Sequence, residues 1–227
     1  MPSVPAATGN RTGAEILQWA RGLVGPALQQ SVARLPASVR KIADYHFAWT
    51  SAPGGRMIGT GKALRPALTL LFAQAVGGNA HDVLRAAAAV ELVHNFSLLH
   101  HDVMDGDAVR RHRPTAWTVF GVPQAILAGG ALLALRLQIL AEQDSGVAGP
   151  AVEQLSAALL ELQSADVAFE SRSEVDLTEC TAMAAGKTGA LIGAACGAWR
   201  IGRRSRRRTS RVRKAVRTSH RARLPAD

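Results

Sequence analysis

Apolar residues recur at intervals of three and four along most of this chain, and this spacing constrains the fold more than any other feature. The segment AEILQWARGLVGPALQQSVARL at 14–35 shows the pattern, and the segment at 82–104 continues it with Ala, Val and Leu. Ala and Leu favour helices, and Val and Ile do not gather in the alternating runs that strands need. The sequence therefore predicts an all-α fold.

Glycine and proline divide the helical pattern into segments. Residues 50–62, TSAPGGRMIGTGK, hold one Pro and four Gly and are predicted to form a loop. Pro66 suits the first turn of the next helix, and a second loop is expected at 106–115. The first expected helix begins near residue 14. The others cover about 37–49, 66 to the Gly pair at 77–78, 82–104, 123–142, 149–171 and 177–198.

The formal net charge of +10 is distributed unevenly, and its distribution indicates three regions. Residues 1–13 form a Pro/Ala/Gly leader, 14–198 a helical domain, and 199–227 an Arg-rich tail that is expected to be disordered. From residue 200 onward the chain holds 12 of its 27 basic residues and a single acid, Asp227, so this segment carries +11 and everything before it −1. The body is therefore not a basic domain.

Cysteine usage and the N-terminus indicate a soluble cytoplasmic protein. Cys180 and Cys196 match no zinc or redox spacing and are interpreted as buried thiols in a reducing compartment. The N-terminal residues MPSVPAATGNRTG lack the basic and apolar stretches of a secretory signal. The longest apolar run, at 119–135, is interrupted by Pro123 and Gln124, and it is too short to predict a membrane span.

The segment SLLHHDVMDGDAVRRHRPTAW at 97–117 concentrates opposite charges at the end of a predicted helix. Asp102 and Asp105 are three residues apart, so their side chains project to one face. Asp107 follows just beyond the helix end. Carboxylates at this spacing suit Mg²⁺, which usually takes one or two of them and completes its shell with water and phosphate oxygens.

Arg110, Arg111 and Arg113 follow these aspartates directly. Arginine binds phosphate through two parallel hydrogen bonds, so the segment predicts a magnesium–diphosphate site. The alternative is a solvated helix end whose charges neutralise one another, and the cluster taken alone does not decide between the two.

Three further elements carry weaker signals of the same kind. Lys62 and Arg65 follow a Gly-rich loop and precede a helix, where backbone N–H groups also face an anion. His94 lies two helical turns before His101 and therefore shares its face. The Lys-Thr pair at 187–188 lies between glycines but lacks the spacing of a P-loop. Each has an ordinary alternative: surface charge, a structural histidine and a helix kink.

In this order the motifs resemble those of the trans-polyprenyl diphosphate synthases, enzymes that join isopentenyl diphosphate to an allylic diphosphate. The resemblance covers about 15–198. It implies an isoprenoid-synthase-type helical bundle around a central cavity, with C-terminal helices missing from this chain. The positions that match the family's contacts to isopentenyl diphosphate are Gly61, Lys62, Arg65 and His94.

The resemblance also implies metal ligands, catalytic residues, further substrate contacts and residues that set product length. The first aspartate-rich motif aligns with 101–105, and a Gln-x-x-Asp element aligns with Gln163 and Asp166. The implied metal ligands are Asp102, Asp105 and Asp166, and the implied catalytic residues are Asp102, Asp105 and Lys187. The other implied substrate contacts are Arg110, Lys187 and Thr188 to the allylic diphosphate, Arg111 to the homoallylic diphosphate, and Gln163. The residues implied to set product length are Phe96 and Ser97.

The implied reaction is Mg²⁺-assisted ionisation of the allylic diphosphate and attack by the isopentenyl double bond, giving a C15–C20 product, with C20 favoured. Two departures predict impaired activity. His101 replaces the leading aspartate and is a softer ligand that does not neutralise Mg²⁺. No acid follows Glu179 until the last residue, so the second aspartate-rich motif is absent. We expect a truncated or frameshifted family member, which a reading of the other two frames beyond codon 198 tests.

Other interpretations remain open from the sequence. The chain is alternatively an inactive prenyl-diphosphate-binding or partner subunit. A second alternative is an all-α His-Asp metal phosphohydrolase that uses His94, His101 and Asp102, although it leaves Lys62 and Arg65 unexplained. If the tail is functional, its positive charge predicts that it binds nucleic acid or anionic lipid nonspecifically. A homodimer is expected if the chain folds.

Overall fold

The described residues of this computed structural model confirm the all-α class. They are 11–50, 63–75 and 77–142, with 152–153, 156–157, 176–178 and 181 beyond them. The elements in chain order are α1 (Gly13–Val32), α2 (Ala37–His46), α3 (Leu64–Ala75), the short 3₁₀ helix η1 (Ala80–Val83), α4 (Leu84–Met104), strands β1 (Val109–Arg110) and β2 (Arg113–Pro114), α5 (Ala116–Phe120) and α6 (Val122–Ala141).

Local interactions set the first helix boundaries. Thr12 and Glu15 form a capping box: the Glu15 amide donates to Thr12 Oγ1 at 3.3 Å, and the Thr12 amide donates to Glu15 Oε2 at 2.7 Å. The helix expected at 37–49 ends earlier, because Ala48 has a φ of 58° that an α-helix does not accept. Phe47 and Trp49 continue the apolar pattern but stack on each other, with ring centroids 4.5 Å apart.

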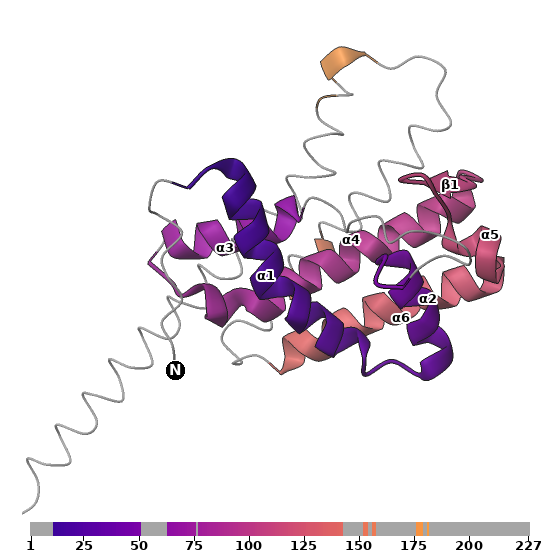
Figure 1. Cartoon of the computed structure of the whole chain (residues 1–227), viewed down its shortest axis with the longest axis horizontal. Helices are drawn as coiled ribbons and strands as arrows, with labels where there is room; N and C mark the ends of the chain where they lie inside the picture. Colours follow the sequence, from indigo (N-terminus) through magenta and orange to yellow (C-terminus); the bar gives the residue numbers. More distant parts are fainter. Residues whose placement is uncertain are drawn as a thin grey trace, which may run out of the picture.

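Helix α4 is the centre of the described fold, and α1, α3, α5 and α6 pack against it (Figure 1). Its first half buries the run of alanines from Ala86 to Ala89, whose small side chains let neighbouring helices approach. Its second half buries Leu92, Val93 and Leu99 in the same core. The end of α4 that follows carries the acidic cluster predicted from the sequence.

Helix α6 runs along α4 at close range. A Cβ atom at Gly129 would lie 2.4 Å from Cδ2 of His100, so only glycine fits at this crossing without displacement. Among the described helices, α6 alone is long and apolar enough to span a membrane by length and composition. It buries Leu132, Leu135 and Ile139 against the rest of the fold, as a core helix does.

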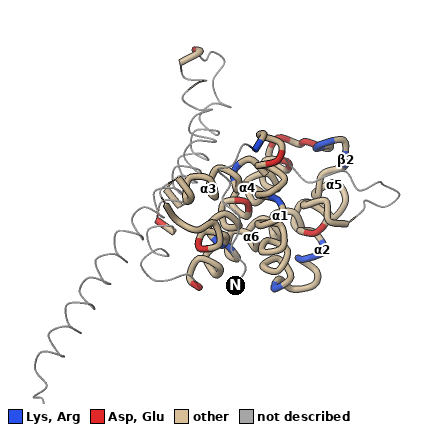
Figure 2. The backbone as a smooth tube through the Cα atoms, turned by 60° about the vertical axis from the view of Figure 1, so that its left-hand side comes forward, with Lys and Arg blue, Asp and Glu red and all other residues tan. Residues whose placement is uncertain are grey.

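The loop expected at 106–115 contains a short antiparallel hairpin in which Arg110 is paired with Arg113. The two turn residues, Arg111 and His112, have φ values of 51° and 61°, as in a type I′ turn. Strands of two residues are too short to show alternation, which explains why the sequence did not predict them. Figure 2 shows the basic residues of the hairpin beside β2, next to the acidic residues that precede them at the end of α4.

Several expectations lie wholly or largely outside the described residues. They are the boundaries of the leader and the tail, the helices expected at 149–171 and 177–198, and the absence of C-terminal helices. These stay predictions.

Candidate functional site

The hairpin is fixed to the end of α2 by contacts across the fold. The Tyr45 hydroxyl donates to the Pro114 carbonyl at 2.8 Å, and the Arg113 guanidinium lies 4.6 Å above the Tyr45 ring. Nη1 of Arg113 also donates to the Tyr45 carbonyl at 3.3 Å. These contacts hold the turn between the strands, and with it Arg110 and Arg111, next to α4.

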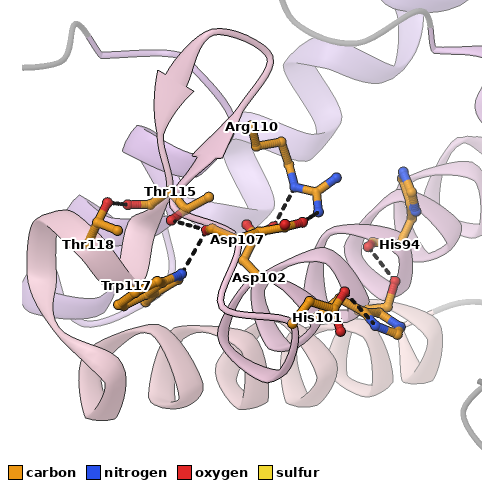
Figure 3. Close-up of polar contacts among 10 residues, drawn as sticks. His94, His101, Asp102, Asp107, Arg110, Thr115, Trp117 and Thr118 are labelled. Carbon is orange, nitrogen blue, oxygen red and sulfur yellow. Dashed lines mark hydrogen bonds and ion pairs between the residues drawn. The ribbon is translucent and has the colours of Figure 1, made fainter. Parts of the chain in front are cut away.

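A second set of hydrogen bonds fixes the segment between α4 and the hairpin. The Asp107 carbonyl accepts from Thr115 Oγ1 and from Trp117 Nε1, both at 2.8 Å (Figure 3). The Asp107 side chain thereby lies beside Arg110, with its Oδ2 3.5 Å from Arg110 Nη2.

A small cavity at the end of α4 is lined by Asp102, one residue of the acidic cluster. It has a volume of about 40 Å³, and the charged side chains that line it are Asp102, Arg110, Arg111 and Arg113. Asp102 is only 1 % exposed, and its Oδ1 accepts from Arg110 Nε at 2.5 Å. Burial raises the pKa of Asp102, and the hydrogen bond from Arg110 acts in the opposite direction. Figure 3 shows the Arg110 guanidinium facing Asp102 and Asp107.

The carboxylates at the end of α4 fit a magnesium ion in their chemistry. Oδ2 of Asp102 is shielded from solvent and has no hydrogen-bond partner within the described part of the chain, so one hard oxygen acceptor is left for a cation. Asp105 is the C-cap residue of α4, and its Oδ2 lies 3.9 Å from Nδ1 of His101. The described residues contain no group of three His, Cys, Asp or Glu side chains arranged to hold a metal.

The larger cleft has a volume of about 750 Å³, which is the size of a small-molecule binding site. Residues of α1, the end of α2, the start of α3, and α4 line it. Its lining includes three residues singled out from the sequence, Arg65, His94 and Arg111, together with Glu91. Arg65 and His94, to which the family resemblance assigns one diphosphate, thus line the same cleft although they lie on different helices.

The charges in the larger cleft are coupled to one another. Burial lowers the pKa of His94 to about 3, and the nearby Arg65 and Arg111 add to this effect, so the ring is neutral. Burial lowers the pKa of Arg65, and the nearby Glu91 opposes the shift. Burial raises the pKa of Glu91, although Arg65 and Arg111 favour its charged form. Two guanidinium groups beside one carboxylate leave a net positive cleft that suits an anion.

The two cavities share a wall. His46, Asn95 and Arg111 line both of them. The smaller cavity has room for an ion or a few water molecules, whereas the larger cleft has room for a small-molecule anion.

The other predicted residues fall into two groups. Phe96 and Ser97 are buried in α4 and belong to neither lining, and the Phe96 ring packs edge-on against His100 with centroids 4.5 Å apart. The predicted residues that lie outside the described part of the chain are Gly61, Lys62, Gln163, Asp166, Lys187 and Thr188.

Sequence reasoning missed His46, Glu91 and Asn95. Glu91 and Asn95 lie four residues apart on α4, where the Asn95 amide donates to Glu91 Oε2 at 3.4 Å and to the Glu91 carbonyl at 2.8 Å. Their position around His94 on one helix face was a usable signal. His46 ends α2 shortly before the Gly-rich loop, and its nearness to α4 is a tertiary contact that no local pattern carries.

Comparison with known proteins agrees with this geometry. The sequence profile of the family described as Polyprenyl synthetase matches residues 48–218 and so reaches into the Arg-rich tail. Two relatives from Mycobacterium tuberculosis are a (2E,6E)-farnesyl diphosphate synthase, 45% identical over 183 residues, and a geranylgeranyl diphosphate synthase, 43% identical over 199 residues. These matches cover 79% and 86% of this chain, but 51% and 56% of the relatives. The chain thus spans about half the length of these curated relatives.

Solved structures give the same result. The polyprenyl synthetase from Streptomyces coelicolor matches with a TM-score of 0.76 and 41% identity, over 84% of this chain and 58% of that one. The geranylgeranyl pyrophosphate synthetase from the archaeon Geoglobus acetivorans matches with a TM-score of 0.71 and 34% identity, over 82% and 60%. A family match over most of its length, with these likenesses in sequence and structure, shows that this chain belongs to the polyprenyl synthetase family.

Proposed function

We propose that this protein binds isopentenyl diphosphate and an allylic diphosphate side by side, in the cytoplasm, and joins them into a C15–C20 prenyl diphosphate, with C20 favoured. The larger cleft carries this proposal, because it has the volume of a small-molecule site, presents Arg65 and Arg111 to an anion, and shares Arg111 with the cavity that is lined by Asp102. The names of the relatives, farnesyl and geranylgeranyl diphosphate synthase, support this substrate class.

Each substrate is assigned to its own set of residues. Arg65, His94 and Arg111 bind the diphosphate of isopentenyl diphosphate in the larger cleft, which has room for it. Arg110 and Asp102 belong to the allylic site. Holding two reactants in neighbouring sites replaces a bimolecular encounter with a positioned one, which accounts for a large share of the rate enhancement in many enzymes.

Asp102, Asp105 and Asp166 would hold a magnesium ion, which would supply charge stabilisation for the departing diphosphate. The unpartnered Oδ2 of Asp102 supports this assignment. Arg110 and Arg111 orient the phosphate oxygens, and the buried wall keeps water from the reacting carbon. The further contacts proposed from the family resemblance are Gly61, Lys62, Gln163, Lys187 and Thr188, with Lys187 also in the catalytic set.

We propose that catalysis is impaired, because His101 stands where the family's motif has an aspartate. The alternative is a subunit that binds prenyl diphosphates without joining them. The histidine at this position also supports this alternative. The match to the polyprenyl synthetase family speaks against a His-Asp phosphohydrolase.

Product length and assembly extend the proposal. Phe96 and Ser97 lie one to two turns before Asp102 on α4, where a bulky ring would limit the growing chain. On α6, Leu127 and Leu137 are 60% and 42% exposed, which favours a homodimer through this helix. We also propose that any binding of the tail to nucleic acid or anionic lipid is incidental, and that deletion of 200–227 abolishes it.

A prenyl-transfer assay tests the function. The chain is incubated with Mg²⁺, labelled isopentenyl diphosphate and C5, C10 or C15 allylic diphosphates, and products are identified by mass. Product formation that disappears in Asp102→Asn/Asp105→Asn but persists in Asp82→Asn, a change at an exposed site in η1, supports the synthase. Binding without product supports the partner subunit. If the chain neither binds the substrates nor forms product, both the synthase and the partner-subunit proposals are contradicted.

A further inference from the structure

His46 has an unused hydrogen-bonding atom at the wall between the two cavities. It is the last residue of α2, and its side chain lines both cavities. Its Nε2 atom exposes almost no surface, yet no group in the described part of the chain forms a hydrogen bond with it. Shielded polar atoms are normally paired, so an unpaired one that lines a binding cleft indicates a contact to a ligand.

The surroundings of His46 indicate an anionic ligand. Arg110, Arg111 and Arg113 all lie close enough to lower the pKa of His46, and together with burial they bring it to about 3. The imidazole is therefore neutral and faces three guanidinium groups of the hairpin. A cation would be repelled here, whereas a phosphate oxygen is attracted by the arginines and accepts a hydrogen bond from the ring.

We propose that Nε2 of His46 contacts the diphosphate of the substrate held in the larger cleft. This inference rests on the proposed function, which assigns that substrate as isopentenyl diphosphate. The larger cleft is favoured over the smaller one on volume, at about 750 Å³ against about 40 Å³. It is also favoured because Arg65 and His94 line the larger cleft only.

Asn95 acts as a positioning residue for this contact. The Asn95 side chain lies close enough to His46 to oppose the lowering of its pKa, and both residues line the two cavities. The Asn95 amide nitrogen in turn donates to the Glu91 carbonyl at 2.8 Å. Asn95 therefore has a fixed position on α4 beside the ring of His46.

Ligand binding should also change the protonation of His46. A diphosphate offsets the positive charge of the arginines, so it favours the imidazolium form and raises the pKa of His46 from its low value. Binding is then coupled to proton uptake. The charged and titratable groups that face this ring or line the same cavities are Arg21, Tyr45, Arg65, Glu91, His94, Asp102, Arg110, Arg111 and Arg113.

Calorimetric titration with isopentenyl diphosphate tests the inference. The full chain is compared with His46→Asn, with Arg65→Ala, and with His81→Asn, an exposed histidine of η1 outside both linings. We expect roughly tenfold weaker binding or more for His46→Asn, as for the loss of a hydrogen bond to a charged group, and no change for His81→Asn. Titration in two buffers of different ionisation enthalpy should show proton uptake that His46→Asn reduces.

The outcomes separate this inference from the proposed function. Unchanged affinity in His46→Asn, with weaker binding in Arg65→Ala, overturns the role of His46 and leaves the proposed function standing. If His46→Asn weakens the binding of dimethylallyl diphosphate but not that of isopentenyl diphosphate, the inference is also overturned, because His46 then belongs to the other substrate. No binding to the unaltered chain contradicts the proposed function itself. If His46→Asn does not fold, imidazole ¹⁵N spectra of the unaltered chain decide: the Nε2 signal of His46 must shift on addition of isopentenyl diphosphate, and an unchanged signal contradicts the contact.

Discussion

The Nε atom of Arg110 lies 2.5 Å from Oδ1 of Asp102, whose side chain is 2% exposed. The pair joins the hairpin to the end of α4, and it links an arginine assigned to a diphosphate with an aspartate assigned to a metal. Burial nevertheless raises the pKa of Asp102, so the desolvation of this carboxylate outweighs the stabilisation from Arg110. A carboxylate kept at a net cost to stability is typical of a functional site.

The pKa shift of Asp102 predicts how Asp102→Asn changes stability with pH. Because the native pKa is higher than the unfolded one, ionisation favours the unfolded state. The contribution of Asp102 to stability is therefore fully present below its usual pKa of 3.8 and is lost as the pH rises through the raised native pKa. Urea unfolding at pH 4 to 7 should show the Asn variant gaining stability relative to the unaltered chain as the pH rises. An Asn variant that is less stable at pH 7 by more than about 1 kcal/mol would mean that the pair with Arg110 dominates.

Arg110→Ala should destabilise the protein, because it leaves Asp102 buried without its cation. We expect a loss of roughly 2–3 kcal/mol in the free energy of unfolding, less than for a fully buried pair because the Arg110 side chain is 31% exposed. In an Asp102→Asn background the same change should cost less than about 1 kcal/mol. Equal losses in the two backgrounds would contradict a specific pairing of these residues.

His94→Gln should remove part of the acid sensitivity of the fold. Burial lowers the pKa of His94 to about 3, whereas the unfolded value is 6.5. The native state thus binds fewer protons than the unfolded state in this window, so stability is present above pH 6.5 and is lost as the pH falls. Between pH 7 and pH 5 the unaltered chain should lose roughly 1–2 kcal/mol more than the Gln variant. If the free energy of unfolding depends on pH in the same way in the unaltered chain and in the Gln variant, His94 is not held neutral in the native state.

Gly129→Ala should destabilise the packing of α4 on α6, because its Cβ would lie 2.4 Å from Cδ2 and 2.5 Å from Nε2 of His100. The expected loss is roughly 1–3 kcal/mol, as for other overpacked cores. The adjacent Gly130→Ala is a matched control: nothing lies within 4 Å of its added Cβ. It should be neutral or stabilising by up to about 1 kcal/mol, since alanine is the better helix former. Thermal unfolding of the two variants decides, and equal melting temperatures would contradict the close contact.

The sequence predicted the elements whose apolar pattern is long. The helices α1, α4 and α6 lie where the spacing of three and four placed them, because each buries a continuous stripe. The end of α2 was missed, since Phe47 and Trp49 match a helical pattern while stacking outside the helix. Local spacing does not reveal such a change in backbone direction.

The sequence predicted the part of the candidate site whose residues lie close together along the chain. Asp102, Arg110 and Arg111 are close in sequence, and their assembly follows from a helix end and a turn. The sharing of one wall by two cavities was not predictable, because His46 and Asn95 belong to distant segments. The tertiary contacts between the end of α2 and the hairpin place His46 near Asn95 of α4.

The measurement that tests the central claim most directly is the number of diphosphate substrates that one chain binds at the same time. Isopentenyl diphosphate and a non-reactive allylic thiolodiphosphate are titrated by calorimetry, each alone and each in the presence of the other with Mg²⁺. Two adjacent sites predict that both ligands bind together, that Arg65→Ala weakens only the isopentenyl diphosphate, and that Asp102→Asn weakens only the allylic analogue. Mutual exclusion of the ligands, or equal loss of both in each variant, would show a single anion site and contradict the account.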